Sequence, residues 1–491
     1  MNQNKKSSQS FEHQNKTVPI NFINKAINAF LWIGFICNIG FLVLNFNERL
    51  DWGFWGLFRI NRFTILIWTM VSFFSAIIGS YSTTYLGGFN YRGRFTGLCL
   101  GFTTSVIVFV ASDHVLPLLL SWFLMGFFMA RLIGVDSNWG EAKEASKYAK
   151  KYFLTGSLFL NVGVLLLAFY CGRFTVSGIS TALNSIPQYI LLLSALFIIT
   201  AAIIQSAIYP FHRWLLSAMT APTPASALMH AGFVNGSGIL LTLFASLLFA
   251  AQMLTLLFII GGLTAITAQF TKLLQTNIKQ KLACSTIAQM GFMIMQCGLG
   301  FFNAAVTHLI LHGFYKAYLF LSSGEYIEAS IPNKPLSIQI KPLQAVVVLL
   351  FGILGAVFFA LLTGKGTSLD SGIFLTLIVA TTVGQATYNV VKQNTLTTWQ
   401  KTFLPFVLFF LGIGCYAFIY KIVTVLMADM SKVEVPLSLS IIQIVFYSLF
   451  LTGFFIMKLS IYKRVPWLYV KLLNLSQPYK KTVLMFKNNS L

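Results

Sequence analysis

The strongest chemical signal in this sequence is a row of ionisable side chains inside an apolar segment. His308, His312 and Lys316 are spaced i, i+4 and i+8, so on a helix they share one face over about two turns. Charge in hydrocarbon is costly and is found mainly where it serves a function. Because His exchanges protons near neutral pH and Lys does so when desolvated, the row is typical of a proton relay.

A second apolar segment carries His230, and four of the six histidines fall between His212 and His312. This clustering favours a joint role for them. Two alternatives remain open. Two histidines at i and i+4 could hold Zn²⁺, although no carboxylate or third ligand lies nearby in the sequence. Each imidazole could instead only hydrogen-bond a carbonyl group of a neighbouring helix.

Helix-breaking residues come before the segment that carries His230. Pro210 ends one apolar run, and Pro222 and Pro224 come immediately before the next one. Interrupted membrane helices free backbone groups that can line a hydrated cavity, so this pattern is typical either of broken helices or of ordinary loop ends. Lys279, at the start of a later run, is by itself typical of a cation at a membrane boundary.

The elements that must position these residues are membrane helices. Of 491 residues, 57% are hydrophobic and 9% are charged, whereas soluble domains carry about 25% charged residues. Apolar runs of about 20 residues, enough to cross a hydrocarbon core of about 30 Å, recur along the chain. The sequence predicts an all-α, polytopic membrane protein with about fourteen transmembrane helices. They are expected near residues 26–46, 63–83, 96–112, 115–134, 152–172, 187–209, 225–245, 248–270, 282–300, 302–323, 342–363, 371–391, 402–425 and 437–457.

The formal charge of +22 arises from 34 Lys and Arg against 12 Asp and Glu. The cations gather in alternate polar connections, which is typical of loops retained in the cytoplasm and not of a nucleic-acid site. We therefore expect a protein of the cell inner membrane, with both termini in the cytoplasm, membrane lipids around it and no nucleic acid as partner. Residues 1–25 are expected to form a cytoplasmic segment, 26–457 the transmembrane domain and 458–491 a basic tail in the cytoplasm or at the membrane surface. The first helix is expected to be an uncleaved anchor.

The cysteines do not suggest a cofactor site. All six lie in or beside apolar runs, without a Cys-x-x-Cys pair. They are expected to be small packing residues, and we expect no metal or other cofactor in this chain.

Several blocks in the middle of the chain resemble the antiporter-like subunits of respiratory complex I and Mrp antiporters. The blocks are Pro210–Leu215, Ala221–Ala231, Gln275–Ala283, Ser285–Gly291 and His308–Ala317. They follow one another in the order and with the spacing of that superfamily. Weaker similarity runs from about residue 60 to about residue 390. The resemblance implies an antiporter-like fold with broken helices, and a proton-conducting transporter subunit instead of an enzyme.

Within this superfamily, Met129–Ile133 and His230–Gly236 look more like the membrane subunit of the DAB inorganic-carbon pump. That resemblance implies that proton or Na⁺ movement is coupled to a large soluble or peripheral partner, a DabA-like subunit that is carbonic-anhydrase-like and hydrates CO₂ to bicarbonate. The zinc would belong to this partner. The resemblance assigns relay roles to five side chains: His230, Lys279, His308, His312 and Lys316.

Two positions depart from the superfamily pattern. Where the pattern has Glu after Trp in an early core helix, this chain has Phe123, and where it has Lys in a broken helix, this chain has Gln205. Both members of the usual ion pair are therefore neutral, and Asp113 and Glu325, the nearest carboxylates, are expected at helix ends. Three functions stay open: the membrane subunit of an inorganic-carbon pump, a cation antiporter subunit like those of Mrp or of NADH-quinone oxidoreductase, and a membrane anchor that conducts no ions and only binds a partner.

Overall fold

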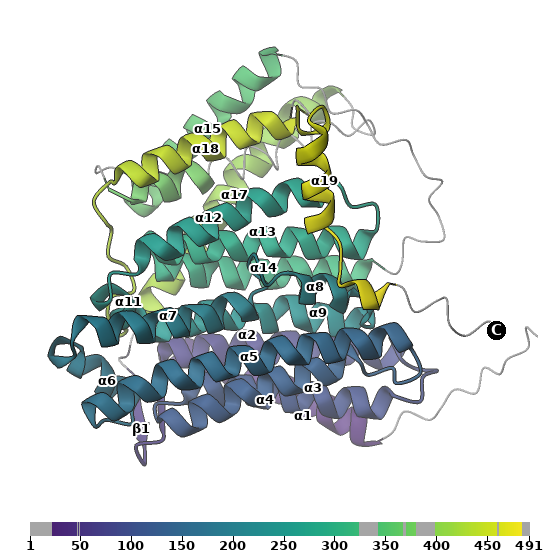
Figure 1. Cartoon of the computed structure of the whole chain (residues 1–491), viewed down its shortest axis with the longest axis vertical. Helices are drawn as coiled ribbons and strands as arrows, with labels where there is room; N and C mark the ends of the chain where they lie inside the picture. The colour runs from purple at the N-terminus through teal and green to yellow at the C-terminus, as the bar shows by residue number, and fades with distance from the viewer. Residues whose placement is uncertain are drawn as a thin grey trace, which may run out of the picture.

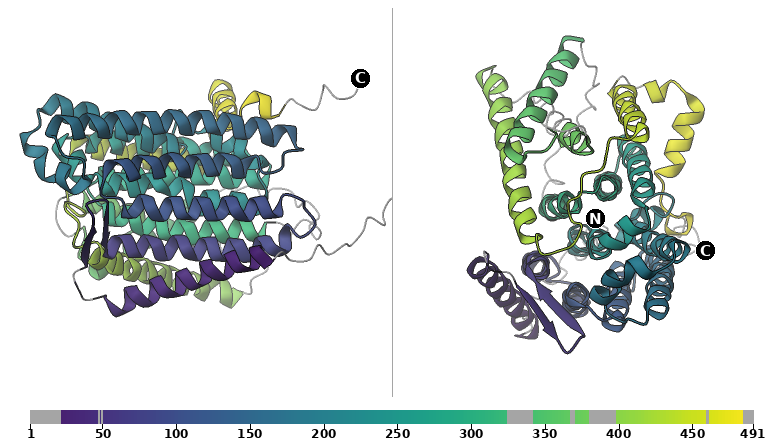
Figure 2. Two further views of the ribbon diagram at one scale, coloured as in Figure 1. Left: turned by 90° about the horizontal axis from the view of Figure 1, so that it is seen from below. Right: turned by 90° about the vertical axis from the view of Figure 1, so that its left-hand side faces the viewer.

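The computed structural model describes residues 22–46, 48, 50–323, 342–366, 370–379, 398–458 and 461–483. Most of the predicted N-terminal segment, the end of the basic tail, Glu325 and the second half of the predicted helix at 371–391 lie outside the described residues. Within them the chain is a bundle of long helices stacked in layers and roughly parallel to one another (Figures 1 and 2). The prediction of an all-helical, polytopic membrane protein is confirmed.

Nine helical segments in the described part of the chain are long and apolar enough to cross a membrane. Six of them are the helices α1 (Phe22–Leu44), α2 (Arg62–Tyr85), α3 (Arg92–Ala111), α4 (Val115–Ile133), α5 (Gly140–Cys171) and α7 (Gln188–Gln205). The others are the segment of α9 (Thr223–Ala231) and α10 (Gly236–Leu243), then α12 (Leu254–Leu273), and residues Phe409–Leu426 of α17 (Thr398–Leu426).

Two further helices of the bundle are less apolar than these nine segments. They are α13 (Ile278–Gly298) and α14 (Phe302–Ser322), and α14 carries the row of His and Lys residues. The remaining elements are shorter or more peripheral: α6 (Val176–Ala182), α8 (Arg213–Ser217), α11 (Ala245–Ala250), α15 (Pro342–Thr363), α18 (Ile441–Lys458) and α19 (Pro466–Leu475). Short 3₁₀ turns are η1 (Leu183–Ser185), η2 (Ala218–Thr220), η3 (Phe233–Asn235), η4 (Ile461–Lys463) and η5 (Lys480–Thr482).

Three predicted elements differ from the structure. Residues 140–151, expected in a polar connection, are the first turns of α5, because Ala142, Ala145 and Ala149 bury one face while the charged residues stay on the other. The helix predicted at 248–270 is split, since α11 ends at Ala250 and α12 begins at Leu254. An antiparallel hairpin of β1 (Asp51–Phe54) and β2 (Phe58–Asn61) stands in a connection where no strand was predicted.

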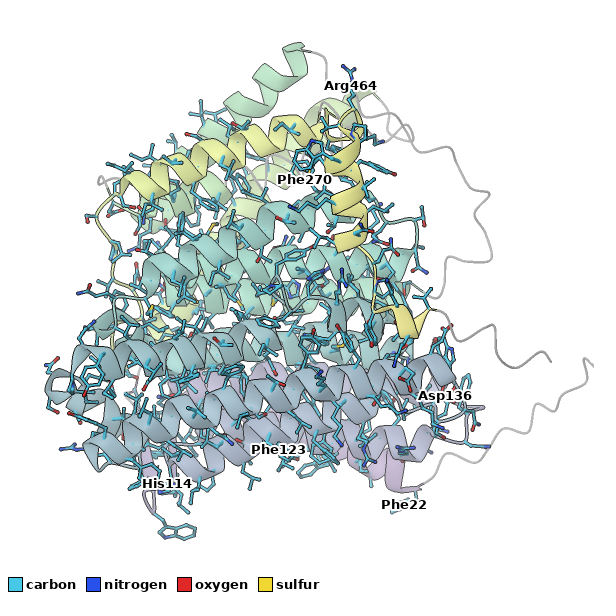
Figure 3. The ribbon with its side chains drawn as sticks, in the orientation of Figure 1. Phe22, His114, Phe123, Asp136, Phe270 and Arg464 are labelled. Atoms are coloured by element: carbon cyan, nitrogen blue, oxygen red, sulfur yellow. The ribbon has the colours of Figure 1, made fainter. Side chains whose placement is uncertain are left out.

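The two ends of the bundle are easily told apart. The β1–β2 hairpin and His114 lie at one end, called here the hairpin end (Figures 1 and 3). Phe22, Asp136 and α19 lie at the other, called here the tail end. At the hairpin end Arg59 forms an ion pair with Asp51 at 2.6 Å, and this hydrogen bond lowers the pKa of the Asp51 carboxyl. If the charge pattern sets the orientation, the tail end faces the cytoplasm.

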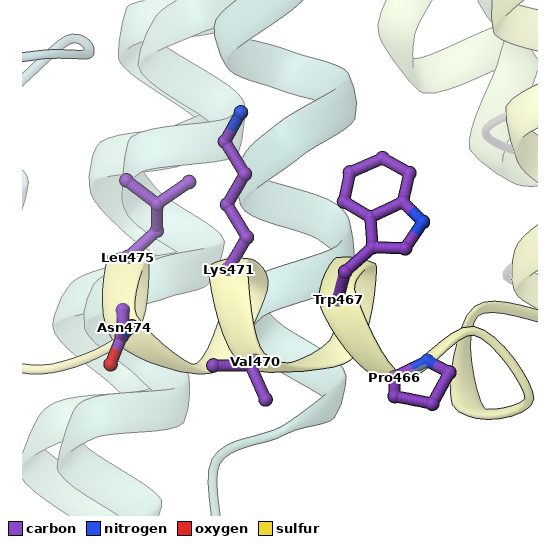
Figure 4. Close-up of a pocket in the computed structure, with 6 residues that line it drawn as sticks. All are labelled: Pro466, Trp467, Val470, Lys471, Asn474 and Leu475. Atoms are coloured by element: carbon purple, nitrogen blue, oxygen red, sulfur yellow. The ribbon is translucent and has the colours of Figure 1, made fainter.

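The tail forms a short helix across the tail end of the bundle. α19 runs roughly perpendicular to the bundle helices (Figure 1). Trp467, Lys471 and Leu475 project from one side of it, and Val470 from another (Figure 4). Trp467 and Val470 are 67% and 52% exposed, and such apolar side chains beside a lysine are typical of a helix at a membrane surface.

Glycines allow α12 and α13 to approach each other closely. A Cβ atom added to Gly291 would lie 2.7 Å from the Gly261 carbonyl oxygen and 2.8 Å from the Ala265 amide nitrogen. Both neighbours are backbone atoms, so they could move away only if the helices separated. This contact presses α13 into the core, where its other side faces α14.

Candidate functional site

The row of ionisable residues on α14 is inside the protein. His308 and His312 are 9% and 5% exposed, and Lys316 is fully buried. The rings of His308 and His312 stack with centroids 6.1 Å apart and an interplanar angle of 22°. Since this separation is too long for a direct hydrogen bond between the rings, a proton would pass between them through intervening water or a ring rotation.

His230 joins these residues from a different helix. It lies on α9, which packs against α14, and its fully buried ring stacks on Phe320 of α14 with centroids 4.4 Å apart. His312 interacts electrostatically with His308, Lys316 and His230. The structure therefore brings together four of the five predicted relay residues. We call these four, His230, His308, His312 and Lys316, the His/Lys cluster.

The ammonium group of Lys316 is held by neutral oxygens. Its Nζ donates to the Leu282 carbonyl oxygen at 2.9 Å and to the Ser285 hydroxyl, both on α13. Within the described part of the chain no carboxylate forms an ion pair with Lys316. A buried amine with neutral acceptors is easier to deprotonate than one with a counter-ion, because only the charged form carries the cost of desolvation.

The imidazoles of the cluster are not occupied with structural hydrogen bonds. Neither ring nitrogen of His230 or His312 has a hydrogen-bond partner among the described residues. The alternative in which each histidine only bonds a neighbouring carbonyl therefore does not describe these two. As for the zinc alternative, the described residues contain no group of three His, Cys, Asp or Glu side chains that could hold a metal ion.

Two of the residues singled out in the sequence lie apart from the cluster. Lys279, at the start of α13, donates from Nζ to the Ala221 carbonyl oxygen at 2.9 Å, and it lines a pocket at the tail end with Trp139 and Pro478. His212 is likewise at the tail end, where its Nε2 lies 2.8 Å from the Leu475 carbonyl oxygen. The expectation that all four clustered histidines act together is thus wrong for His212.

His212 connects the core to the tail. Burial lowers its pKa to about 4, so the ring is neutral at physiological pH and its Nε2–H donates to the Leu475 carbonyl. Two further contacts hold the same segment. The Tyr479 amide donates to the Ser217 hydroxyl at 2.9 Å, and the Tyr479 ring stacks in parallel on Tyr148 with centroids 4.2 Å apart.

Broken helices position His230, as the sequence suggested. α7 ends at Gln205, and α9 and α10 are separated by the turn η3. The two breaks face each other: Gln205 Nε2 donates to the Phe233 carbonyl oxygen at 3.3 Å, and Ser206 Oγ donates to the Val234 carbonyl oxygen at 2.7 Å. Carbonyl groups freed by one interruption are thus satisfied by polar side chains of the other.

The two neutral positions occupy different environments. Gln205 is 3% exposed and lies at the facing breaks, whereas Phe123 on α4 is 37% exposed and stacks on Phe127 at the surface (Figure 3). Of the carboxylates expected at helix ends, Asp113 lies at the hairpin end and accepts from the Ser177 hydroxyl at 2.6 Å. Neither position nor Asp113 supplies charge to the His/Lys cluster.

One polar site was missed from the sequence. Glu434 lies in the connection between α17 and α18 and accepts a hydrogen bond at 2.7 Å from Asn303, in the first turn of α14. The connection is short and polar, so Glu434 looked like an ordinary loop carboxylate. The available signal was Asn303, an amide five residues before His308 in an otherwise apolar first turn.

Parallel helices, two facing helix breaks and a buried line of titratable groups define an antiporter-like membrane protein. The family described as NADH:quinone oxidoreductase/Mrp antiporter, transmembrane, matches residues 112–387. The match covers more than half of the chain, so the chain belongs to this family, and the resemblance seen in the sequence blocks is confirmed.

The relatives include transporter and respiratory subunits. A probable inorganic carbon transporter subunit, DabB of Hydrogenovibrio crunogenus, is 31% identical over 283 residues, which cover 56% of this chain and 54% of the relative. NADH-quinone oxidoreductase subunit L of Rickettsia felis is 32% identical over 295 residues, covering 58% and 45% of the two chains. The chain spans about half the length of these curated relatives.

The fold is also found among solved structures. A chain of the Mrp complex from Dietzia sp. DQ12-45-1b superposes with a TM-score of 0.62 at 21% identity, over 89% of this chain and 55% of that one. At this identity the similarity concerns the fold alone. It agrees with the antiporter-like arrangement of broken helices.

Proposed function

We propose that this chain is the membrane subunit of an energy-coupled inorganic-carbon pump in the cell inner membrane, with both termini in the cytoplasm and about fourteen transmembrane helices. Proton or Na⁺ movement through the membrane domain would drive hydration of CO₂ to bicarbonate by a separate, zinc-dependent, carbonic-anhydrase-like partner. The chain would be a transporter subunit and not itself an enzyme. The DabB relatives support the inorganic-carbon part of this proposal.

The observation that carries the transport part is the His/Lys cluster. Four titratable side chains from α9 and α14 are buried next to one another, and the amine of Lys316 has only neutral acceptors. Burying ionisable groups without counter-ions costs stability, and such groups are retained in membrane proteins mainly on ion or proton pathways. A purely structural anchor would gain nothing from this arrangement.

Each member of the cluster has a chemical role in the proposal. Lys316 would hold or release a proton at Nζ near the tail end of α14, and His312 and His308 would relay it along the helix. His230 would link α9, and with it the facing helix breaks, to this row. Lys279 would act at the tail end, where its pocket could exchange protons with the cytoplasm.

The partner is expected to bring the hydration chemistry. We expect the chain, tagged and expressed from its own locus, to co-purify with a large zinc-containing protein, with zinc measured by elemental analysis. Recovery of the chain alone, or only with other hydrophobic antiporter subunits, would contradict the carbon-pump proposal.

A cation antiporter subunit is the second candidate. The similarity to subunit L of Rickettsia felis and the fold shared with the Mrp complex favour it. The neighbouring genes separate the two proposals. A gene for a large soluble protein with Cys, Asp and His zinc ligands favours the carbon pump, and a run of genes for small hydrophobic subunits favours the antiporter.

A further inference from the structure

The connection between α17 and α18 is fixed by backbone contacts to the start of α14. The Phe302 amide donates to the Val433 carbonyl oxygen at 2.9 Å, and the Val435 amide donates to the Gly300 carbonyl oxygen at 3.0 Å. Gly300 has a φ of +87°, and a Cβ atom there would collide with the Val435 carbonyl. Glu434, between the two pinned residues, is therefore held at the hairpin end of α14 by the backbone.

The side chain of Glu434 lies in a polar site built from four segments. Asn303 Nδ2 of α14 is 2.7 Å from Glu434 Oε2 and 2.8 Å from the Thr424 hydroxyl of α17. The Tyr420 hydroxyl, also of α17, donates to Glu434 Oε1 at 3.4 Å. Lys365, which follows α15, forms an ion pair with the same carboxylate. Asn303 is fully buried, which is costly for an amide unless its partners are in place.

The same site is partly open to solvent. The side chains of Glu434 and Lys365 are 18% and 24% exposed. The carboxylate thus stands at a boundary, with buried Asn303 on one side and water within reach on the other. A group in this position can exchange a proton or cation with the medium, which a fully buried carboxylate cannot.

α14 connects this site to the His/Lys cluster. Asn303 precedes His308 by five residues, an axial rise of about 7.5 Å, and it precedes Lys316 by about 20 Å. Thr307, whose hydroxyl donates to the Asn303 carbonyl oxygen at 2.8 Å, is fully buried between them. One helix therefore carries a partly exposed acidic site at its hairpin end and a buried amine toward its tail end.

We propose that Glu434 is the proton-exchange carboxylate at the hairpin end of α14, with Lys365 as its displaceable counter-ion and Asn303 as its positioning residue. This inference rests on the proposed function. When the Lys365 ammonium moves away, the carboxylate accepts a proton from the α14 row and releases it to water, or the reverse. The titratable groups that face it are Lys365 and Tyr420, and Asp370 acts on Lys365 in turn.

The test compares two ion pairs of one connection. Asp429 pairs with Arg62 at 2.7 Å and its side chain is also 18% exposed, but it does not contact α14. Uptake of radiolabelled bicarbonate is measured in cells that express each variant from the native locus, with protein level and thermal melting in parallel. We expect Glu434→Gln to lose uptake at least about tenfold at unchanged protein level, and Asp429→Asn to stay within about twofold of wild type.

A double variant separates proton exchange from a structural ion pair. If Glu434 and Lys365 only hold loops together, removing both charges is nearly neutral, because no unpaired charge remains. We expect Glu434→Gln with Lys365→Met to stay inactive. Recovery of uptake in the double variant, normal uptake in Glu434→Gln, or equal losses in Glu434→Gln and Asp429→Asn would overturn the proposal.

The Lys316→Met variant keeps this failure distinct from failure of the proposed function. If Lys316→Met abolishes uptake while Glu434→Gln preserves it, only the role of Glu434 is wrong. If Lys316→Met itself shows wild-type uptake, the proposed function fails, and the role of Glu434 fails with it.

Discussion

Replacing Lys316 with Met tests the relay most directly. The substitution keeps the aliphatic stem in its fully buried position and removes the charge. It also removes two hydrogen bonds, to the Leu282 carbonyl oxygen and the Ser285 hydroxyl. Bonds to a charged donor are worth about 1.5–3 kcal/mol each, whereas desolvating an ammonium costs several kcal/mol.

These opposing contributions predict a small change in the free energy of unfolding, within about 2 kcal/mol in either direction. Transport should respond very differently. A positioned proton-transfer group contributes a factor of about 10²–10⁴ to a reaction rate, so we expect uptake of radiolabelled bicarbonate to fall roughly 100-fold. Protein level, thermal melting and partner co-purification should be retained.

Two further variants make this prediction sharper. Lys316→Arg keeps a positive charge that cannot be released at physiological pH, so it should also be inactive if Lys316 must deprotonate. Lys421→Met, at an exposed position of α17, removes a lysine outside the cluster and should keep normal uptake. Wild-type uptake by Lys316→Met at normal protein level would refute the reasoning and favour the non-conducting anchor.

Three other predictions concern packing, topology and the tail. Gly291→Ala should lower the melting temperature and the protein level, because its Cβ meets backbone atoms of α12 at a cost of about 1–3 kcal/mol, whereas Gly97→Ala on α3, with nothing within 4 Å, should be neutral; equal melting of the two variants would contradict the packing argument. In a variant without native cysteines, an impermeant thiol reagent added to intact cells should label a cysteine at Trp55, at the hairpin end, and not one at Lys147, at the tail end; the reverse pattern would invert the topology. His212→Ala removes the contact to Leu475, so trypsin should cut the tail of the purified protein several-fold faster while uptake persists, and an unchanged cleavage rate would show that His212 does not hold the tail.

Much of the fold could be predicted because hydrophobic length has one meaning in a membrane. An apolar run of about 20 residues can satisfy its backbone groups in lipid only as a helix. The predicted helix positions therefore agree with the structure wherever the runs are long, as in α2, α3 and α4. They differ where amphipathic turns extend a helix, as at residues 140–151 of α5, because a window of hydrophobicity ends at the first lysines while the buried alanines continue.

The row on α14 could also be predicted, since i, i+4 and i+8 spacing is a property of one helix and needs no knowledge of its neighbours. The sequence by itself thus determined the membrane class, the family blocks and the shared face of His308, His312 and Lys316. Their burial followed from the apolar residues around them.

Only the tertiary structure decided which other residues belong to the site. His230 joins α14 from a helix about 80 positions earlier, whereas His212 turns to the tail and bonds Leu475, 263 positions later. Glu434 reaches Asn303 across 131 positions. Such contacts depend on how helices with nearly uniform apolar surfaces pack together, and hydrophobicity along the chain does not specify that. The packing alone placed a carboxylate at one end of α14 and left the buried amine of Lys316 without one.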